Sequence, residues 1–448
     1  MPTRKRPRRT PPLARLSGIT SLTISGYKSI STPQTVELRP LTILAGTNSS
    51  GKSSIMQPLL LLKQTLESSY DPGPLLLNAA NVRFTSMDQF LSLLPDGHSH
   101  DAFSIGLTLW PNVTMDLWFQ RQARRTIDIK SMRLSGTDGD VELRANMSSD
   151  EVWNAVPHQL KDLTRSSDGD AATRWAIVRN RCFLAVGLKF LGVNLGVTPF
   201  PIWPVPQVEQ AIRSVIHLPG LRGNPERTYP VAAISPTFPG TFQEYCASVI
   251  AYWQNNRDSE KLRDLSSNLK TLGLTSRVLA RSVTDAQVEL RVSRLAHSKK
   301  SGTTDMVSIA DVGVGVSQTL PVLVALLVAE HGQLVYIEQP EIHLHPRAQV
   351  ALADILANAA LRGVQVVAET HSSLLLLGIQ ALVAEGRLPP DLIRLHWFQR
   401  NADGATEISS AELDETGAFG EWPEDFGEVT LEAQSRYLDA AETRQLEG

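Results

Sequence analysis

The chain has 448 residues, enough for two or three domains, and its 42% hydrophobic and 20% charged residues are typical of a globular protein with a sizeable core. The two cysteines, Cys182 and Cys246, exclude a disulfide framework or a Cys-rich zinc site, and no apolar run reaches the roughly 18 residues of a membrane-spanning helix. The net charge of −3 conceals a basic start and an acidic end. We therefore expect a soluble cytoplasmic protein without membrane contact.

The basic start, residues 1–16, holds six Lys and Arg side chains and no acidic one. No apolar stretch follows it, so it is not a secretory signal. Two interpretations stay open: a disordered, solvated tail, or an arm that touches nucleic-acid phosphates, which requires only flexible positive charge.

Residues 17–148 alternate between short strand patterns and turns, with one helix. The expected strands up to residue 46 are SLTISGYKSI, TVELRP and LTILAG, all rich in Ile, Val, Leu and Thr. Apolar residues at helical spacing predict a helix over residues 52–68. The segments FSIGLTLW, VTMDLWFQ, TIDIKSMRL and DVELR predict an antiparallel meander that reaches about Arg144.

Residues 149–284 have longer helical patterns, such as FQEYCASVIAYW, so we expect an inserted, mainly helical subdomain. Over residues 285–400 a strand–helix–strand series follows, with LVYIE and VQVVAET as its apolar strands, which is typical of a parallel sheet. A small acidic segment, residues 401–448, ends the sequence.

The strongest motif is GTNSSGKS at residues 46–53, which matches the phosphate loop G-x-x-x-x-G-K-[ST] and lies between a predicted strand and a predicted helix. Glycines let backbone N–H groups converge on phosphate oxygens, the Lys reaches the β- and γ-phosphates, and the Ser hydroxyl serves Mg²⁺. We therefore predict ATP and Mg²⁺ as cofactors. The residues expected to bind ATP here are Gly46, Asn48, Ser49, Ser50, Gly51, Lys52, Ser53 and Ser54.

Two later strand ends supply candidate catalytic groups. Glu338 ends the apolar strand 334–337 and is placed as the Walker B carboxylate that, with Ser53, holds Mg²⁺. His371 follows the next parallel strand, where its ring can contact the γ-phosphate or the attacking water. Gln89, 37 residues beyond Lys52, is a candidate for a glutamine that senses Mg²⁺.

The segments GTNSSGKSS, DVGVGVSQTLP, YIEQPEIHLHP and AETHSSLLL together resemble ATPases of the ABC/SMC/RecF class. They are similar in particular to bacterial AAA-type ATPases related to the overcoming-lysogenization-defect (OLD) family, in a branch with a small C-terminal domain of unknown function. The resemblance implies an α/β P-loop NTPase fold of the ABC-ATPase head type, with a mixed sheet and an antiparallel β subdomain. Residues 17–148 and 285–400 would be the two halves of this head.

The resemblance also implies a dimer of heads, or a higher oligomer, with ATP held between the phosphate loop of one copy and a signature segment of the other. Gly315, Ser317 and Gln318 are the candidate signature residues. OLD relatives carry a Toprim nuclease with a D-x-D pair, which is not found after His371, so a separate effector protein is expected. Anti-phage defence is the implied setting, and DNA is a candidate partner.

Two features depart from the pattern that the resemblance implies. One is the signature segment, which reads GVGVSQ at residues 313–318 in place of Leu-Ser-Gly-Gly-Gln, and the other is the residue after the Walker B strand end. The residue after the Walker B carboxylate normally carries the general base, but here it is Gln339, which orients water and takes no proton at neutral pH. Either Glu341 substitutes as the base, or hydrolysis is slow and ATP acts mainly as a clamp.

Other candidates have simpler interpretations beside the functional ones. His343 and His345 match no metal-binding spacing that we recognise, and a turn into the next helix explains them as well. Arg222 and Arg227 are candidates for phosphate contacts or for surface ion pairs.

Three functions stay open at this point. The first is an ATP-dependent switch, the second a self-contained ATP-dependent endonuclease that uses the Glu/His cluster, and the third an ATPase subunit of an ABC-type transporter.

Overall fold

The structure is a computed structural model that describes residues 18–93, 99–122, 126–136, 139–156, 161, 173–190, 198–200, 202, 204–294, 305–420 and 435–436. The predicted basic tail at 1–16 and nearly all of the acidic segment beyond residue 420 lie outside the described residues.

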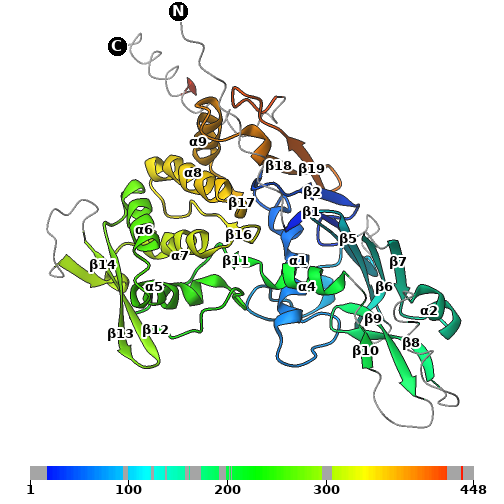
Figure 1. The fold of residues 1–448 in the computed structure, drawn as a ribbon. Coiled ribbons are helices and arrows are strands. Elements are labelled where there is room, and N and C mark those ends of the chain that lie inside the picture. The colour runs from blue at the N-terminus through cyan, green and yellow to red at the C-terminus, as the bar shows by residue number, and fades with distance from the viewer. Residues whose placement is uncertain are drawn as a thin grey trace, which may run out of the picture.

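A six-stranded sheet forms the centre of the molecule (Figure 1). Five of its strands are parallel and β19 closes one edge antiparallel to β18. In spatial order they are β11 (Ile216–Leu218), β16 (Leu334–Glu338), β17 (Gln365–Thr370), β3 (Leu41–Gly46), β18 (Ile393–Arg400) and β19 (Thr406–Ala411).

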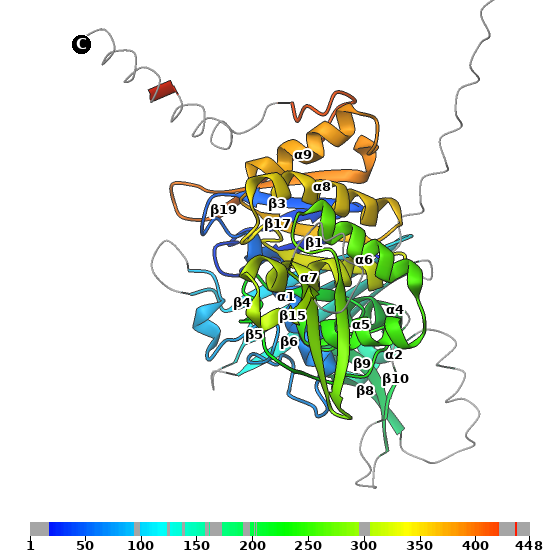
Figure 2. The same cartoon turned by 90° about the vertical axis from the view of Figure 1, so that its left-hand side faces the viewer.

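Alternate residues of the central strands enter two different cores, because successive side chains of a strand point to opposite faces. Leu44 and Tyr336 pack on one face with α1 (Lys52–Glu67), and Ile43 and Ile337 pack on the other with a layer of helices. Figure 2 shows two of those helices, α8 and α9, stacked beside β3 and β17. The helices of this layer are α5 (Cys246–Asn255), α6 (Ser259–Thr271), α7 (Val314–Val328), α8 (Pro346–Leu361) and α9 (Ser373–Ala384).

A second, antiparallel sheet covers α1 from the other side. Its inward residues, such as Leu22, Ile105 and Leu117, share a core with Leu59 of α1. The predicted meander is confirmed. The strands, in spatial order, are β2 (Gln34–Glu37), β1 (Ile19–Ser25), β4 (Ala102–Leu109), β5 (Val113–Arg121), β6 (Ile127–Gly136) and β7 (Gly139–Arg144).

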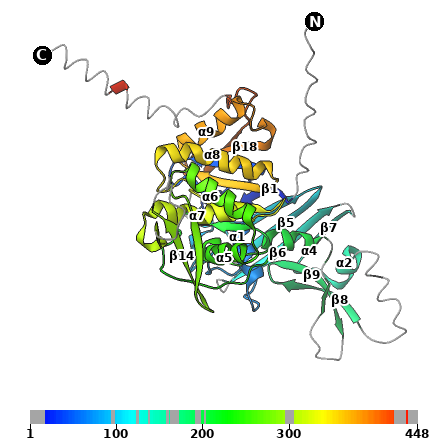
Figure 3. The ribbon, with the colours of Figure 1, turned by 60° about the vertical axis from the view of Figure 1, so that its left-hand side comes forward.

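The expected insertion at 149–284 does contain helices, but it also contains strands that the sequence does not predict. The segment carries a three-stranded sheet that lies beyond β7, at the opposite end of the molecule from α8 and α9 (Figure 3). It also contributes β11 to the central sheet, and this strand of three residues is too short to show a period in the sequence. The further elements of the segment are α2 (Ser149–Ala155), β8 (Thr173–Asn180), β9 (Phe183–Phe190), β10 (Thr198–Phe200), α4 (Val205–Arg213), β12 (Tyr229–Pro230) and β13 (Val278–Thr284).

A small outer sheet and several short helices complete the described residues. β14 (Gln287–Ser293) pairs with β12, β13 and β15 (Met306–Ser308). The short 3-10 helices are η1 (Met87–Gln89), η2 (Phe242–Tyr245), η4 (Ile309–Asp311) and η5 (Pro390–Leu392). Among the described helices none is both long and apolar enough to span a membrane.

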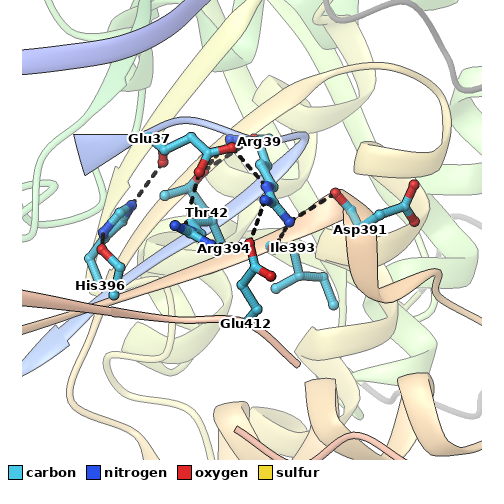
Figure 4. A network of polar contacts seen from close by, with 9 residues as sticks. Glu37, Arg39, Thr42, Asp391, Ile393, Arg394, His396 and Glu412 are labelled. Carbon is cyan, nitrogen blue, oxygen red and sulfur yellow. Dashed lines mark hydrogen bonds and ion pairs between the residues drawn. The ribbon is translucent and has the colours of Figure 1, made fainter. Parts of the chain in front are cut away.

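A polar network joins the edge of the central sheet to β2 (Figure 4). Arg39 donates to Glu37 at 3.0 Å and to Glu412 at 2.8 Å, and Arg394 pairs with both of these carboxylates. His396 of β18 lies beside the network and bonds the Glu37 carbonyl oxygen at 2.8 Å. The network therefore ties the two sheets together next to β3.

Candidate functional site

The phosphate loop joins the end of β3 to the start of α1, as predicted. Gly46 and Gly51 have φ values of 146° and 104°, a region that favours glycine. Both are also crowded, because a Cβ would lie 2.2 Å from the Phe398 carbonyl oxygen at the first position and 2.4 Å from Thr406 Oγ1 at the second. Only glycine fits at either end of this loop.

Lys52 lies within the loop that it closes. Its ammonium group donates to the carbonyl oxygens of Gly46 at 3.0 Å and Thr47 at 2.7 Å. Burial lowers the pKa of Lys52, and the carboxylates of Glu369 and Glu341 act in the opposite direction. The structure thus places a buried cation where the motif predicts the phosphates.

A hollow of about 480 Å³ opens above the loop and is lined mostly by polar atoms. It brings together groups that are far apart in the sequence, including the predicted pair Gln339 and His371. The described residues that line it are Lys28, Ser29, Asn48, Ser49, Ser50, Gly51, Lys52, Ser53, Ser54, Gln57, Gln339, Glu369, His371 and Arg400.

His371 directly follows β17 and lies against the phosphate loop. Its ring hydrogen-bonds the Gly46 backbone. Burial, and then the nearby Lys52, lower the pKa of His371 below its ordinary value, so the ring is neutral at pH 7. Because the one N–H of the neutral ring donates to the Gly46 carbonyl oxygen, the other ring nitrogen can only accept a hydrogen bond, for example from water.

Glu338 is not among the described residues that line the hollow. One carboxylate oxygen pairs with His217 Nε2 at 3.2 Å and the other accepts from the Gly220 N–H at 3.1 Å. The His217 ring in turn stacks on Tyr336 and contacts Asn81 at 2.9 Å. The structure does not bring Glu338 to Ser53, because β17 lies between β16 and β3.

Glu369 occupies the place that the sequence analysis gave to Glu338. Its Oε1 accepts from the Ser53 hydroxyl at 2.9 Å, and its Oε2 accepts from the Tyr336 hydroxyl at 3.0 Å. Burial, and then the neighbouring Glu338, raise the pKa of Glu369. In the sequence, Glu369 lies directly before Thr-His in the segment AETHSSLLL. Its position there predicts only the end of a strand.

Gln339 and Glu341 both lie in the turn after β16, but they have different surroundings. Gln339 adopts a φ of 46°, donates its N–H to the Glu369 carbonyl oxygen at 2.8 Å, and lines the hollow. Glu341 is only 8% exposed, and its Oε1 accepts from the Thr370 hydroxyl at 2.8 Å and from the His371 N–H at 2.9 Å. Glu341 therefore holds the turn after β17.

The candidate signature residues lie at the start of α7 and do not line the hollow of their own chain. Gly315 packs against the backbone of the 343–345 turn, and the Ser317 hydroxyl donates to the Val314 carbonyl at 3.0 Å. Gln318 is 6% exposed and donates to the Gly223 carbonyl oxygen.

Arg222 and Arg227 have different roles from each other. Arg222 is 7% exposed and donates to the carbonyl oxygens of Gln318 at 3.2 Å and Glu338 at 2.7 Å. Burial lowers the pKa of Arg222 to about 10. It connects the signature helix to the end of β16. Arg227 forms a surface ion pair with Asp311 at 2.8 Å.

The predicted magnesium-sensing Gln89 lies elsewhere. It bonds the Thr85 backbone and hydroxyl and lines a neighbouring hollow, which shares Lys28 and Arg400 with the phosphate-loop hollow. His345 caps α8 by accepting from the Arg347 N–H, as the turn interpretation predicts. Within the described part of the chain, no group of three or more His, Cys, Asp or Glu side chains is placed to hold a metal ion.

Three further residues lie beside the loop without any signal in the sequence. Arg400 donates to the Ser49 carbonyl oxygen at 2.8 Å, and the Thr406 hydroxyl donates to the Ser50 carbonyl oxygen at 2.7 Å. Lys28 lines the hollow from the turn after β1. Only the folded sheet brings these residues together, so no local motif marks them.

Two parts of the chain match family models of ATPase domains. Residues 18–124 match a family model described as "AAA ATPase domain", and residues 252–377 match one described as "AAA domain, putative AbiEii toxin, Type IV TA system". A search of curated proteins gave no match. The family matches and the central sheet support an ATPase with the P-loop fold of the ABC-ATPase head type.

Solved structures of SMC heads are similar to the chain at low sequence identity. The SMC head bound to the C-winged helix domain of ScpA is 12% identical, with 89% of this chain and 98% of that chain covered and a TM-score of 0.46. The SMC head domain from Thermotoga maritima is 10% identical, with coverage of 88% and 100% and a TM-score of 0.38. An Smc head bound to the C-terminal domain of ScpA, derived from Pyrococcus furiosus, is 10% identical, with coverage of 95% and 99% and a TM-score of 0.45.

Proposed function

We propose that this protein binds and slowly hydrolyses ATP with Mg²⁺, and that it works as a switch in which ATP closes two copies head to tail. The observation that carries the proposal is the phosphate-loop hollow, where Lys52, Ser53 and His371 meet and where Gln339 stands in the position of the usual base. We place the protein in the cytoplasm.

The residues of the hollow fit a magnesium-bound triphosphate. Lys28, Lys52 and Arg400 bring positive charge, and the loop lies at the N-terminal end of α1, where backbone N–H groups attract anions. Ser53 and Glu369 present oxygen atoms, the ligands that Mg²⁺ prefers. When bound, Mg²⁺ would neutralise charge on the phosphate oxygens.

The polar groups around the γ-phosphate position support slow turnover. Gln339 orients water but accepts no proton at neutral pH. Glu341, the other candidate base, has one oxygen engaged by Thr370 and His371 and lies buried behind the turn. The neutral ring of His371, whose N–H is engaged by Gly46, is left to accept a hydrogen bond from a water molecule.

The exposed start of α7 supports a two-headed assembly. Gly315 and Ser317 lie away from the hollow of their own chain, so a second copy is needed for them to contact ATP. Homodimers or higher oligomers built from such heads would open and close with ATP.

The proposal also includes a role in bacterial anti-phage defence. In that role the protein would act with a separate nuclease or similar effector, and DNA is a candidate partner. Its support is the resemblance to OLD-family ATPases, in the branch without a Toprim nuclease, and the family model matched by residues 252–377, whose description names a toxin of a toxin–antitoxin system.

The rate of ATP turnover in three proteins tests the slow switch. We expect poor turnover in the wild type and an acceleration of about tenfold or more in Gln339→Glu, equivalent to about 1.4 kcal/mol of barrier, because a carboxylate can take the proton from water. Glu341→Gln is the matched control and should keep the slow rate. Brisk wild-type turnover that vanishes in Glu341→Gln would contradict the proposal.

A plasmid-cleavage assay with Mg²⁺ or Mn²⁺, with and without ATP, separates the switch from a self-contained endonuclease. The switch predicts intact plasmid under all four conditions, with the purified chain alone. Plasmid cleavage that is lost when the phosphate loop is mutated would contradict the switch and support the self-contained endonuclease.

A further inference from the structure

Two carboxylates lie side by side at the carboxyl ends of the central strands, and they have different surroundings. Parallel pairing sets Glu338 of β16 opposite Glu369 of β17, and Glu369 opposite Leu44 of β3, two residues before the phosphate loop begins at Gly46. Glu369 is therefore one strand closer to the loop than Glu338.

The contacts of Glu369 point into the nucleotide hollow. Its Oε1 accepts from the Ser53 hydroxyl at 2.9 Å, the group that a phosphate loop offers to Mg²⁺. Its Oε2 is fixed by the Tyr336 hydroxyl at 3.0 Å, and only 5% of the residue is exposed. Such a carboxylate is already oriented toward the metal side of a bound nucleotide.

The side-chain partners of Glu338, His217 and Gly220, are not among the described residues that line the hollow. Both of its oxygens are engaged, by His217 at 3.2 Å and by the Gly220 N–H at 3.1 Å. Its backbone carbonyl accepts from Arg222 at 2.7 Å. To reach Ser53, the side chain would have to break two hydrogen bonds in a largely buried place, which is costly.

We propose that Glu369, and not Glu338, is the carboxylate that acts with Ser53 on the magnesium side of bound ATP. Glu338 is a positioning residue, which holds the loop after β11 and, through Arg222, the start of the signature helix. This inference rests on the proposed ATP binding and assigns the metal-side role within that same site.

Calorimetric ATP titrations with Mg²⁺ and with EDTA test the assignment. The ratio of the two affinities measures the gain from the metal, which we expect to be about tenfold or more in the wild type. Glu369→Gln should reduce this gain to less than about twofold while the affinity in EDTA stays unchanged, since the amide keeps its shape but loses its charge. Glu338→Gln is the matched control and should keep the wild-type gain.

A second readout and a second variant keep the test decisive. Electron paramagnetic resonance of Mn²⁺ with ATP should show protein-bound metal in the wild type and in Glu338→Gln, and free metal–nucleotide in Glu369→Gln. If Glu369→Gln fails to fold in a thermal melt, Glu369→Asp, whose carboxylate is drawn back by one methylene, should show an intermediate gain.

Two results overturn the assignment: a full metal gain in either Glu369 variant, or a loss of the gain in Glu338→Gln alone. A wild type that binds no ATP at all would instead refute the proposed function, so the two failures are distinguishable.

Discussion

Positive side chains surround the phosphate loop, and two of them, Lys52 and Arg400, are fixed by backbone carbonyl oxygens. Lys52 donates to two carbonyls of its own loop, and Arg400 donates to the Ser49 carbonyl oxygen. A triphosphate offers these donors stronger, charged acceptors. ATP binding therefore exchanges internal hydrogen bonds for charge-assisted ones.

Lys52→Ala should abolish ATP binding at micromolar protein concentrations, because it removes the mobile cation that reaches the β- and γ-phosphates. Isothermal titration calorimetry measures the loss, and circular dichroism checks that the fold is retained. An unchanged affinity would refute the whole assignment of the nucleotide site.

At the scale of elements, the edge formed by β18 and β19 holds the loop in place. The Thr406 hydroxyl reaches Ser29 and the Ser50 carbonyl oxygen, and His396 bonds Ser410 and the Glu37 carbonyl oxygen, both at 2.8 Å. This edge therefore connects β1, β2 and the phosphate loop through side chains as well as through the β3–β18 ladder.

The edge should make stability sensitive to acid. Burial lowers the pKa of His396 to about 4, below the 6.5 of an unfolded His, so the folded state favours the neutral ring. The neutral His396 ring makes its full contribution to the free energy of unfolding above pH 6.5. This contribution is lost as the pH falls toward 4. Between pH 7 and pH 5 this costs about 2 kcal/mol of unfolding free energy.

The variant His396→Asn removes the titrating ring. Urea unfolding at pH 7 and pH 5 should show a loss of stability that is about 2 kcal/mol smaller in this variant than in the wild type. Equal losses in the two proteins would show that another group carries the acid sensitivity.

The elements that the sequence predicted well have a period or a motif. The strand before Gly46, helix α1, the meander, β16, α8 and β17 all follow from apolar spacing and the phosphate-loop pattern. β11 and the β8–β9 sheet were missed, because three residues show no period and because helical neighbours dominated the interpretation of 149–284.

The site could be predicted only as far as local motifs reach. The loop residues and His371 were found because each follows a recognisable strand. Glu369 was passed over and Glu338 chosen, because the sequence does not tell which of two acidic strand ends lies next to β3. Strand order is a tertiary property, and it decides which carboxylate meets Ser53.

At the scale of the whole molecule, the proposed switch requires a second copy. ATP with Mg²⁺ should shift the protein toward a dimer, or tighten an existing one, because each signature segment completes the other head's site. Small-angle scattering with and without ATP measures the shift. Identical profiles in the two states would count against the clamp.

A matched pair of surface variants locates the contact. Val314 is 44% exposed at the start of α7, and Val314→Asp should prevent the ATP-dependent dimer by placing a buried charge in it. Leu361 is 46% exposed at the end of α8, next to the start of β17 and far from the carboxyl ends of the strands. Leu361→Asp should leave the dimer intact.

The place of β3 in the central sheet has a consequence for how the protein is made. Its two neighbours, β17 and β18, contribute residues 365–370 and 393–400, more than 300 positions later in the chain. At a synthesis rate of roughly 5–20 residues per second, β3 waits on the order of 20 to 70 s for its partners. During that time the apolar side chains of β3 and the apolar face of α1 must be protected from aggregation. A chaperone could cover them, or the antiparallel sheet could, since its strands are synthesised before β17 and β18. A ribosome-bound chain shorter than about 400 residues therefore has the complete phosphate-loop sequence and still no rigid cradle for a nucleotide.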